Sequence, residues 1–146
     1  MPKACILCYS KEAMIKIILG TNRKNSVSKL IALQYQQILS EKGQASEILE
    51  LEELPNDFIE TALYENNGKN ESYNRFHQKV AEGQKFIFIV PEYNGSFPGI
   101  LKTFIDGMTY PNTFRNKKAA LVGLSSGIGG GGIALSHLTD IFHYLG

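Results

Sequence analysis

Short apolar runs alternate along the chain with segments whose apolar residues follow helical spacing. The runs cover residues 15–19, 45–51, 86–90 and 119–124. A parallel strand that is buried on both faces reads as a continuous apolar run, and strands that alternate with helices favour an α/β fold. We therefore predict a parallel sheet flanked by helices, with the most apolar run, 86–90, near its centre.

Helix signals follow each run. Ser26 is a good N-cap residue, and Val27, Leu30, Ile31, Ile38 and Leu39 then recur at helical spacing until Gly43. Further helices are predicted over 72–82, from Pro98 onward and at the end of the chain. Residues 55–70 are polar and irregular, and we predict a long surface connection there with at most one helical turn.

Composition limits the classes of function. The chain has 146 residues, 43% of them hydrophobic and 20% charged, with a net charge of +1. These values are typical of one globular domain and give no electrostatic reason to bind nucleic acid or a membrane. No apolar run approaches the roughly 20 residues that span a bilayer. The first residues lack the features of a secretory signal, so a cytoplasmic location is expected.

Cys5 and Cys8 form a CxxC pair near the start of the chain. A redox pair or half of a zinc site is one interpretation, but the chain contains no second cysteine pair and no histidine at ligand spacing. Two reduced cysteines in an N-terminal extension is the simpler interpretation. We predict such an extension over 1–13 and a folded domain over 14–146, with Met14 as a possible alternative start.

The loop after the first run carries the chemistry of an anion site. It contains three hydroxyls, Thr21, Ser26 and Ser28, together with the guanidinium of Arg23, and it leads into a helix. Backbone N–H groups and the positive end of a helix favour an anion at such a point. The residues therefore predict that a phosphate-bearing cofactor binds this loop.

Two later loops also follow predicted strands. One reads Pro91-Glu92-Tyr93-Asn94-Gly95-Ser96 and suits a planar ring; the other runs from Ser125 through the glycines to Gly132. The second loop satisfies G-x-G-x-x-G, but the dinucleotide fingerprint also needs an acidic residue about 20 positions later, and the sequence ends before it. Ligands of open parallel sheets bind at the carboxyl ends of the strands, so all three loops are expected at one edge.

Three motifs together resemble the NADPH-dependent FMN reductase family: Gly20-Thr21-Asn22-Arg23-Lys24-Asn25-Ser26, the segment PEYNGSFPGILK at 91–102, and Ser125-Ser126-Gly127. The middle motif is the distinctive one. The resemblance implies a flavodoxin-like three-layer α/β sandwich with strand order 2-1-3-4. It further implies FMN, with the phosphate at Thr21, Arg23, Ser26 and Ser28 and the ring between two groups of residues, namely Pro91, Glu92, Tyr93, Asn94 and Gly95, and Ser125, Ser126 and Gly127.

The same resemblance implies NADPH or NADH as co-substrate, a small electron acceptor such as a quinone, and a homodimer or homotetramer in which Phe97 and Pro98 contribute to the interface. It names no catalytic side chain. Two departures stand out: the family commonly has Asn at the position of Ser28, and it continues into a fifth strand and a last helix that this sequence lacks. A fourth strand left at the edge would expose backbone N–H and C=O groups. The sequence is then a fragment, or a partner covers the edge, or the protein is unstable alone; we favour a fragment or truncated product.

The leading hypothesis is an NAD(P)H-dependent flavin oxidoreductase, in which hydride passes from nicotinamide to FMN and then to an acceptor. The alternatives are an FMN-binding electron carrier or interaction protein without nicotinamide-dependent activity, and a degenerate domain that binds no flavin.

Overall fold

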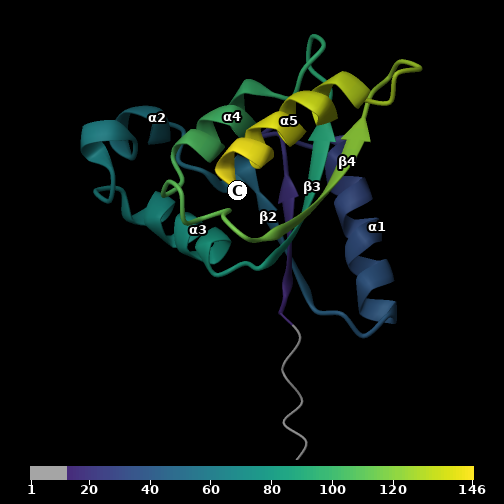
Figure 1. The fold of residues 1–146 in the computed structure, drawn as a ribbon, viewed down its shortest axis with the longest axis horizontal. Helices are drawn as coiled ribbons and strands as arrows, with labels where there is room; N and C mark the ends of the chain where they lie inside the picture. Colours follow the sequence, from purple (N-terminus) through teal and green to yellow (C-terminus); the bar gives the residue numbers. More distant parts are fainter. Residues whose placement is uncertain (1–12) are drawn as a thin grey trace, which may run out of the picture.

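The computed structural model describes residues 13–146, so Cys5 and Cys8 lie outside the described residues. Within that range β1 (Ile15–Leu19), β2 (Ser46–Glu50), β3 (Lys85–Pro91) and β4 (Lys118–Leu124) form one parallel sheet. The strand order is β2-β1-β3-β4, which confirms the predicted topology (Figure 1). β3 pairs with both β1 and β4, and its residues from Phe86 to Val90 are buried, as the apolar run predicts.

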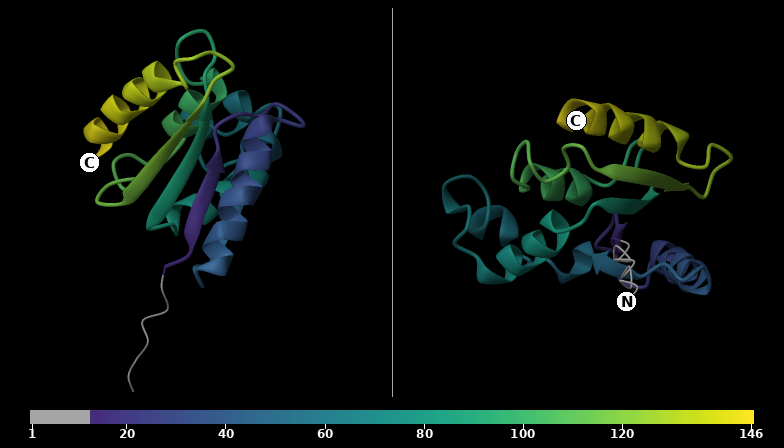
Figure 2. Two further views of the ribbon diagram at one scale, coloured as in Figure 1. Left: turned by 90° about the vertical axis from the view of Figure 1, so that its right-hand side faces the viewer. Right: turned by 60° about the horizontal axis from the view of Figure 1, so that its bottom comes forward.

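Helices cover the two faces of the sheet unequally. α1 (Val27–Glu41) lies on one face, while α3 (Glu71–Ala81), α4 (Gly99–Asp106) and α5 (Gly132–Leu145) contribute to the core on the other (Figure 2). The smaller core, under α1, is built around Ile17, Ile87 and Ala32. This arrangement is the predicted α/β sandwich, with a single helix on one side among the described residues.

α1 begins where the sequence predicts, and small residues form the part of it that is buried against the sheet. Ser26 is extended and its Oγ accepts from the Lys29 amide at 3.3 Å, as an N-cap does. The buried residues are the small Ser28 and Ala32, which let the helix lie close to the strands. Of the apolar residues at helical spacing, Ile31 and Leu39 pack against the core, whereas Val27 and Leu30 are 64% and 66% exposed.

The connection over residues 55–70 lies mostly at the surface, as predicted, but three of its residues reach the core and it has more local structure than expected. It contains the one-turn helix α2 (Phe58–Thr61) and a short 3-10 turn, Tyr64–Asn66. Phe58, Ala62 and Leu63 are buried in the core beside α3, where the Phe58 ring stacks on Tyr73 with centroids 5.7 Å apart. Isolated apolar residues in a polar segment carry no periodicity, so their burial is decided by tertiary contact.

One charged residue is buried in the sheet. Lys16 lies in β1 directly opposite Glu47 of β2, and its Nζ donates to Glu47 Oε2 at 2.6 Å. Lys79 of α3 approaches the other carboxylate oxygen at 3.3 Å. Burial by itself would raise the pKa of Glu47, but the hydrogen bonds from Lys16 and Lys79 outweigh it and lower the pKa. The carboxylate therefore compensates a buried ammonium group.

The substitution Glu47→Gln is expected to lower the free energy of unfolding by about 1.5–3 kcal/mol, because it leaves the Lys16 ammonium without its charged acceptor. Urea denaturation monitored by circular dichroism measures this. Glu50→Gln is the matched control, since Glu50 pairs with the half-exposed Lys29 at 2.9 Å and should change stability by less than about 1 kcal/mol. Equal losses in the two variants would contradict the role of Lys16.

His77 links α3 to the segment that follows α4. Its Nε2 accepts from the Thr109 amide at 3.3 Å and lies 3.1 Å from the Thr109 hydroxyl. Burial lowers the pKa of His77, so the neutral ring is the form that the folded state favours. Protonation would remove the acceptor on which the Thr109 amide depends.

Stability is therefore expected to fall as pH decreases from about 7 to 5. Above the ordinary histidine pKa of about 6.5 the stabilisation is fully present, and it is lost as pH falls through the lower pKa of the folded state. His77→Gln should show a shallower pH dependence of the urea midpoint than the wild type. His143→Gln, at an exposed position of α5, should keep the wild-type slope; the reverse pattern would exclude His77 as the titrating group.

Candidate functional site

The carboxyl ends of β1, β3 and β4 surround one cavity of about 370 Å³. Volumes of roughly 300–1,000 Å³ are usual for small-molecule sites. Each of the three loops singled out in the sequence contributes to the walls. The lining residues are Thr21, Arg23, Asn25, Ser26, Val27, Ser28, Pro91, Glu92, Tyr93, Leu124, Ser125 and Ser126.

One wall has the chemistry of an anion site. It is formed by the loop from Thr21 to Ser26 and the first turn of α1, whose amide N–H groups have no partner within the helix. Thr21 and Ser28 are each only 2% exposed, so their hydroxyls are held within the protein. Arg23 adds a positive charge at the rim. Hydroxyls, a guanidinium and a helix N-terminus together suit a phosphate group.

The opposite wall begins with Pro91, Glu92 and Tyr93. The Tyr93 hydroxyl lies 3.0 Å from Thr21 Oγ1, so this hydrogen bond joins the loop after β3 to the loop after β1. The Glu92 amide donates to the Leu124 carbonyl at 2.7 Å and joins the same loop to the end of β4. The three loops are thus connected directly as well as being neighbours.

Asn94 and Gly95 form the tip of a tight hairpin and do not line the cavity. Tyr93 and Ser96 exchange backbone hydrogen bonds of 2.7 and 3.1 Å, and both tip residues have positive φ, 51° and 77°. An Asn-Gly pair is the sequence that a two-residue hairpin of this geometry prefers. Their place in the structure is to turn the chain so that Tyr93 faces Thr21.

The loop after β4 supplies Ser125 and Ser126, while Gly127 lies next to the cavity lining, with its amide donating to Ser125 Oγ at 3.0 Å. The glycines beyond fold back over the strand. A Cβ at Gly123 would lie 2.6 Å from the Gly130 carbonyl oxygen, closer than real Cβ atoms come. Glycine at this position therefore lets the loop close over the end of β4.

Nine of the twelve predicted site residues line this cavity; Asn94, Gly95 and Gly127 do not. Three residues that the sequence analysis did not name as ligands also line it: Asn25, Val27 and Leu124. Each adjoins a predicted residue, and Asn25 precedes the N-cap with a positive φ of 52°. Their position next to predicted residues could have suggested these three residues, but no motif of their own marks them.

The cavity offers binding groups rather than reactive side chains. Its lining contains no cysteine, histidine or lysine. Within residues 13–146 no three His, Cys, Asp or Glu side chains lie together in a way that could hold a metal ion. No helix in that part of the chain is both long and apolar enough to cross a membrane. The hydrogen-bond donors at one end of the cavity suit a phosphate group. The space between Tyr93 and Ser125 suits a flat, uncharged group.

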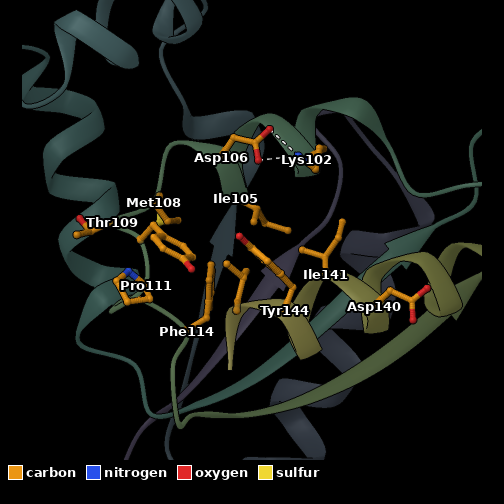
Figure 3. Close-up of a pocket in the computed structure, with 12 residues that line it drawn as sticks. Lys102, Ile105, Asp106, Met108, Thr109, Pro111, Phe114, Asp140, Ile141 and Tyr144 are labelled. Carbon is orange, nitrogen blue, oxygen red and sulfur yellow. Dashed lines mark hydrogen bonds and ion pairs between the residues drawn. The ribbon is translucent and has the colours of Figure 1, made fainter.

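A second cavity, of about 430 Å³, lies between α4 and α5 and contains none of the predicted site residues. Figure 3 shows Met108 and Phe114 facing Ile141 and Tyr144 across it, with the Lys102–Asp106 ion pair at its rim. The Tyr110 and Tyr144 rings stack with centroids 6.1 Å apart and are largely exposed. This cavity lacks the hydroxyl-rich wall that characterises the first.

A family model described as NADPH-dependent FMN reductase matches residues 13–146. The NAD(P)H:quinone oxidoreductase of Solanum tuberosum is 32% identical over 123 residues, which cover 82% of this chain and 63% of the relative. The quinone reductase of Pseudomonas putida is 30% identical over 127 residues, covering 84% of this chain and 65% of that protein. The chain thus spans slightly less than two thirds of the length of these relatives.

Solved structures share the fold. FerB, a flavoenzyme NAD(P)H:(acceptor) oxidoreductase from Paracoccus denitrificans, superposes with a TM-score of 0.71 at 27% identity, covering 92% of this chain and 72% of FerB. The apo form of the NADH:FMN oxidoreductase EMOB gives a TM-score of 0.77 at 18% identity, covering 91% of this chain and 69% of EMOB. Because EMOB is only 18% identical to this chain, its similarity supports the fold alone.

Gly123→Ala is expected to destabilise the protein by about 1–3 kcal/mol and to displace the loop after β4, because the added methyl group would overlap the Gly130 carbonyl. Gly129→Ala is the matched control, since a Cβ there meets nothing within 4 Å and the substitution should change stability by less than about 0.5 kcal/mol. Urea denaturation compares the two. If they lose equal stability, the close approach is not what requires glycine at 123.

Proposed function

Since the chain belongs to the NADPH-dependent FMN reductase family, we propose that it is an NAD(P)H-dependent flavin oxidoreductase that reduces a quinone-like or other small acceptor. The expected family and the flavodoxin-like fold are confirmed, and FMN with NADPH or NADH is the cofactor set of that family. The observation that carries the proposal is the single cavity that joins a hydroxyl-rich, positively charged wall to an aromatic one.

The phosphate of FMN is assigned to the wall formed by Thr21, Arg23, Ser26 and Ser28. Burial of Thr21 and Ser28 holds two hydroxyl donors in place before the ligand arrives, which reduces the entropy lost on binding. The free N–H groups at the start of α1 and the Arg23 guanidinium offset the negative charge. Asn25 lines the same wall and is added to this set.

The flavin ring is assigned to the space between two loops. Pro91, Glu92 and Tyr93 would border one side, and Ser125, Ser126 and Gly127 the other. Asn94 and Gly95 support this side of the site through the hairpin rather than through direct contact. Because the Tyr93 hydroxyl is held by Thr21, the tyrosine ring has a defined position against which a planar group can pack.

When FMN is bound, the chemistry supplied at this site is hydride transfer from NADPH or NADH and onward reduction of an acceptor. The residues of the chain bind, orient and neutralise charge; no side chain in the lining is required as an acid or base. The named activities of the Solanum tuberosum and Pseudomonas putida relatives support a quinone as acceptor. An electron carrier without nicotinamide-dependent activity is the second candidate.

A homodimer or homotetramer and a cytoplasmic location remain predictions. Phe97 packs against the core of its own chain and Pro98 is buried within it, so neither is the best candidate for subunit contact. Tyr110 and Tyr144, 64% and 76% exposed beside the α4–α5 cavity, are better placed for such contact.

The function is tested by mixing the purified protein with FMN, removing free flavin on a desalting column and recording the absorbance spectrum. We expect about one flavin per chain, and bleaching of its absorbance when NADPH or NADH is added without oxygen. Retained flavin that neither nucleotide bleaches would favour the electron carrier. A folded protein that retains no flavin would exclude both functions.

Arg23→Ala is expected to weaken FMN binding by about 1.5 kcal/mol or more, which is a roughly tenfold higher Kd, because a charge-assisted hydrogen bond to the phosphate is lost. Lys24→Ala is the control, as Lys24 is exposed and outside the cavity lining. Titration of FMN fluorescence measures both. Riboflavin, which lacks the phosphate, should bind wild type and Arg23→Ala equally; equal FMN affinity in all three proteins would contradict the phosphate assignment.

A further inference from the structure

Two hydroxyl groups meet where the loops after β1 and β3 come together. The Tyr93 hydroxyl lies 3.0 Å from Thr21 Oγ1, and both residues line the candidate cavity. Each loop follows a strand inside the sheet, because β1 lies between β2 and β3, and β3 lies between β1 and β4. The position of this pair is therefore set by the central strands and does not depend on either edge of the sheet.

Thr21 is held in place by the pairing of the two central strands. The amide of the preceding residue, Gly20, donates to the Ile89 carbonyl at 2.9 Å, and a Cβ at Gly20 would already lie 3.0 Å from that oxygen. Thr21 itself is only 2% exposed. Polar groups that are buried to this degree need hydrogen-bond partners. The partners of the Thr21 hydroxyl must therefore be neighbouring protein atoms or a molecule in the cavity.

Tyr93 is positioned independently by its hairpin. Its amide and its carbonyl both bond to Ser96, at 2.7 and 3.1 Å, and Ser96 Oγ lies 3.0 Å from His137 Nδ1 of α5. The Tyr93 side chain is 39% exposed, so burial in the core is not what places it. The hydroxyl that reaches Thr21 is thus presented by a hairpin that is fixed at its base.

The hydrogen bonds of Thr21 leave two possible arrangements. A threonine hydroxyl has one proton to donate and two lone pairs that accept. The Arg23 amide donates to Thr21 Oγ1 at 3.2 Å and uses one lone pair. If Tyr93 donates as well, both lone pairs are occupied and the Thr21 proton is left for a third partner. If Thr21 donates to Tyr93 instead, no proton of Thr21 remains for a ligand.

A phosphate in the cavity distinguishes these arrangements. Ionised phosphate oxygens only accept hydrogen bonds, and the phosphate is assigned to the wall that Thr21 shares with Arg23. Only the arrangement in which Tyr93 donates offers the Thr21 proton to that phosphate. Hydrogen bonds in a chain polarise one another, so donation by Tyr93 strengthens donation by Thr21.

We propose that Tyr93 is a positioning residue of the phosphate site: its hydroxyl donates to Thr21 Oγ1 and so turns the Thr21 proton toward the phosphate of FMN. The inference rests on the proposed function, because it concerns the same cavity. The Tyr93 ring borders the flavin, whereas its hydroxyl serves recognition of the phosphate. A residue from the ring side of the site thereby contributes to the preference for FMN over riboflavin, which has no phosphate.

Tyr93→Phe tests this inference, since it removes the hydroxyl and keeps the ring. Titration of flavin fluorescence should show a Kd for FMN that is about three- to tenfold higher, as expected for the loss of one hydrogen bond. The Kd for riboflavin should not change. Tyr64→Phe is the matched control, because Tyr64 is 80% exposed and outside the cavity lining. A hydroxyl that only held the ring in place would weaken both flavins equally, and that result would overturn the proposal.

A second measurement uses FMN alone and determines whether Tyr93 acts through Thr21. In a Thr21→Val background, which lacks the hydroxyl, Tyr93→Phe should change the FMN Kd by less than about twofold. In a Thr21→Ser background, which keeps a hydroxyl, the full effect should remain. Such a cycle of substitutions isolates the coupling between two residues. The same loss in both backgrounds would mean that Tyr93 contacts the ligand directly, and it would overturn the proposal.

The results also separate this inference from the proposed function. Equal FMN affinity in the wild type and Tyr93→Phe would overturn the inference and leave flavin binding intact. A folded wild type that binds no flavin would overturn both. Circular dichroism checks the folding of each variant. If Thr21→Val does not fold, the comparison of FMN with riboflavin decides, and if riboflavin binds too weakly to measure, the cycle with FMN decides.

Discussion

The pairing of β1 with β3 at the centre of the sheet is the interaction on which the rest of the structure depends. Leu19 lies opposite Ile89, and the Gly20 amide continues the ladder by donating to the Ile89 carbonyl at 2.9 Å. This register places the end of β1 beside the last residues of β3. The loop that carries Thr21 and the loop that carries Tyr93 therefore begin side by side, and the Thr21–Tyr93 hydrogen bond follows from that alignment.

Parallel strand direction explains why the candidate site is assembled from three separate parts of the sequence. All strands of the sheet have their carboxyl ends on the same side, and each connection contains a helix that leads the chain back to the opposite side, where the next strand starts. Binding groups after β1, β3 and β4 consequently meet in one cavity although more than a hundred residues separate Thr21 from Ser126. Short contacts from Glu92 and Tyr93 then hold the loops together.

Within residues 13–146 the two faces of the sheet are covered by helices to different degrees. On one face α3, α4 and α5 enclose a core rich in aromatic rings, in which the ring centroids of Phe88 and Phe142 lie 4.9 Å apart. On the other face α1 packs over β1, β2 and β3 and leaves β4 partly uncovered. On this less covered face Val122 and Leu124 of β4 are half-buried.

The sequence by itself determined the strands and the three site loops, whereas the order of the strands was implied by the resemblance to the family. Continuous apolar runs mark buried strands, Ser26 marks a helix start, and strand direction brings the loops together. It also indicated the family, through the segment from Pro91 to Lys102. These features are local, or follow from one rule of sheet topology, so they can be read without coordinates.

Only the tertiary structure decided which side of α1 is buried, that Phe58 and Leu63 join the core, and that Lys16 pairs with Glu47. It also decided that Asn94 and Gly95 turn the chain rather than line the cavity. Each of these depends on which distant segment lies opposite a residue. Sequence periodicity describes a residue relative to its neighbours along the chain, and it contains no information about which residue of a distant segment packs against it.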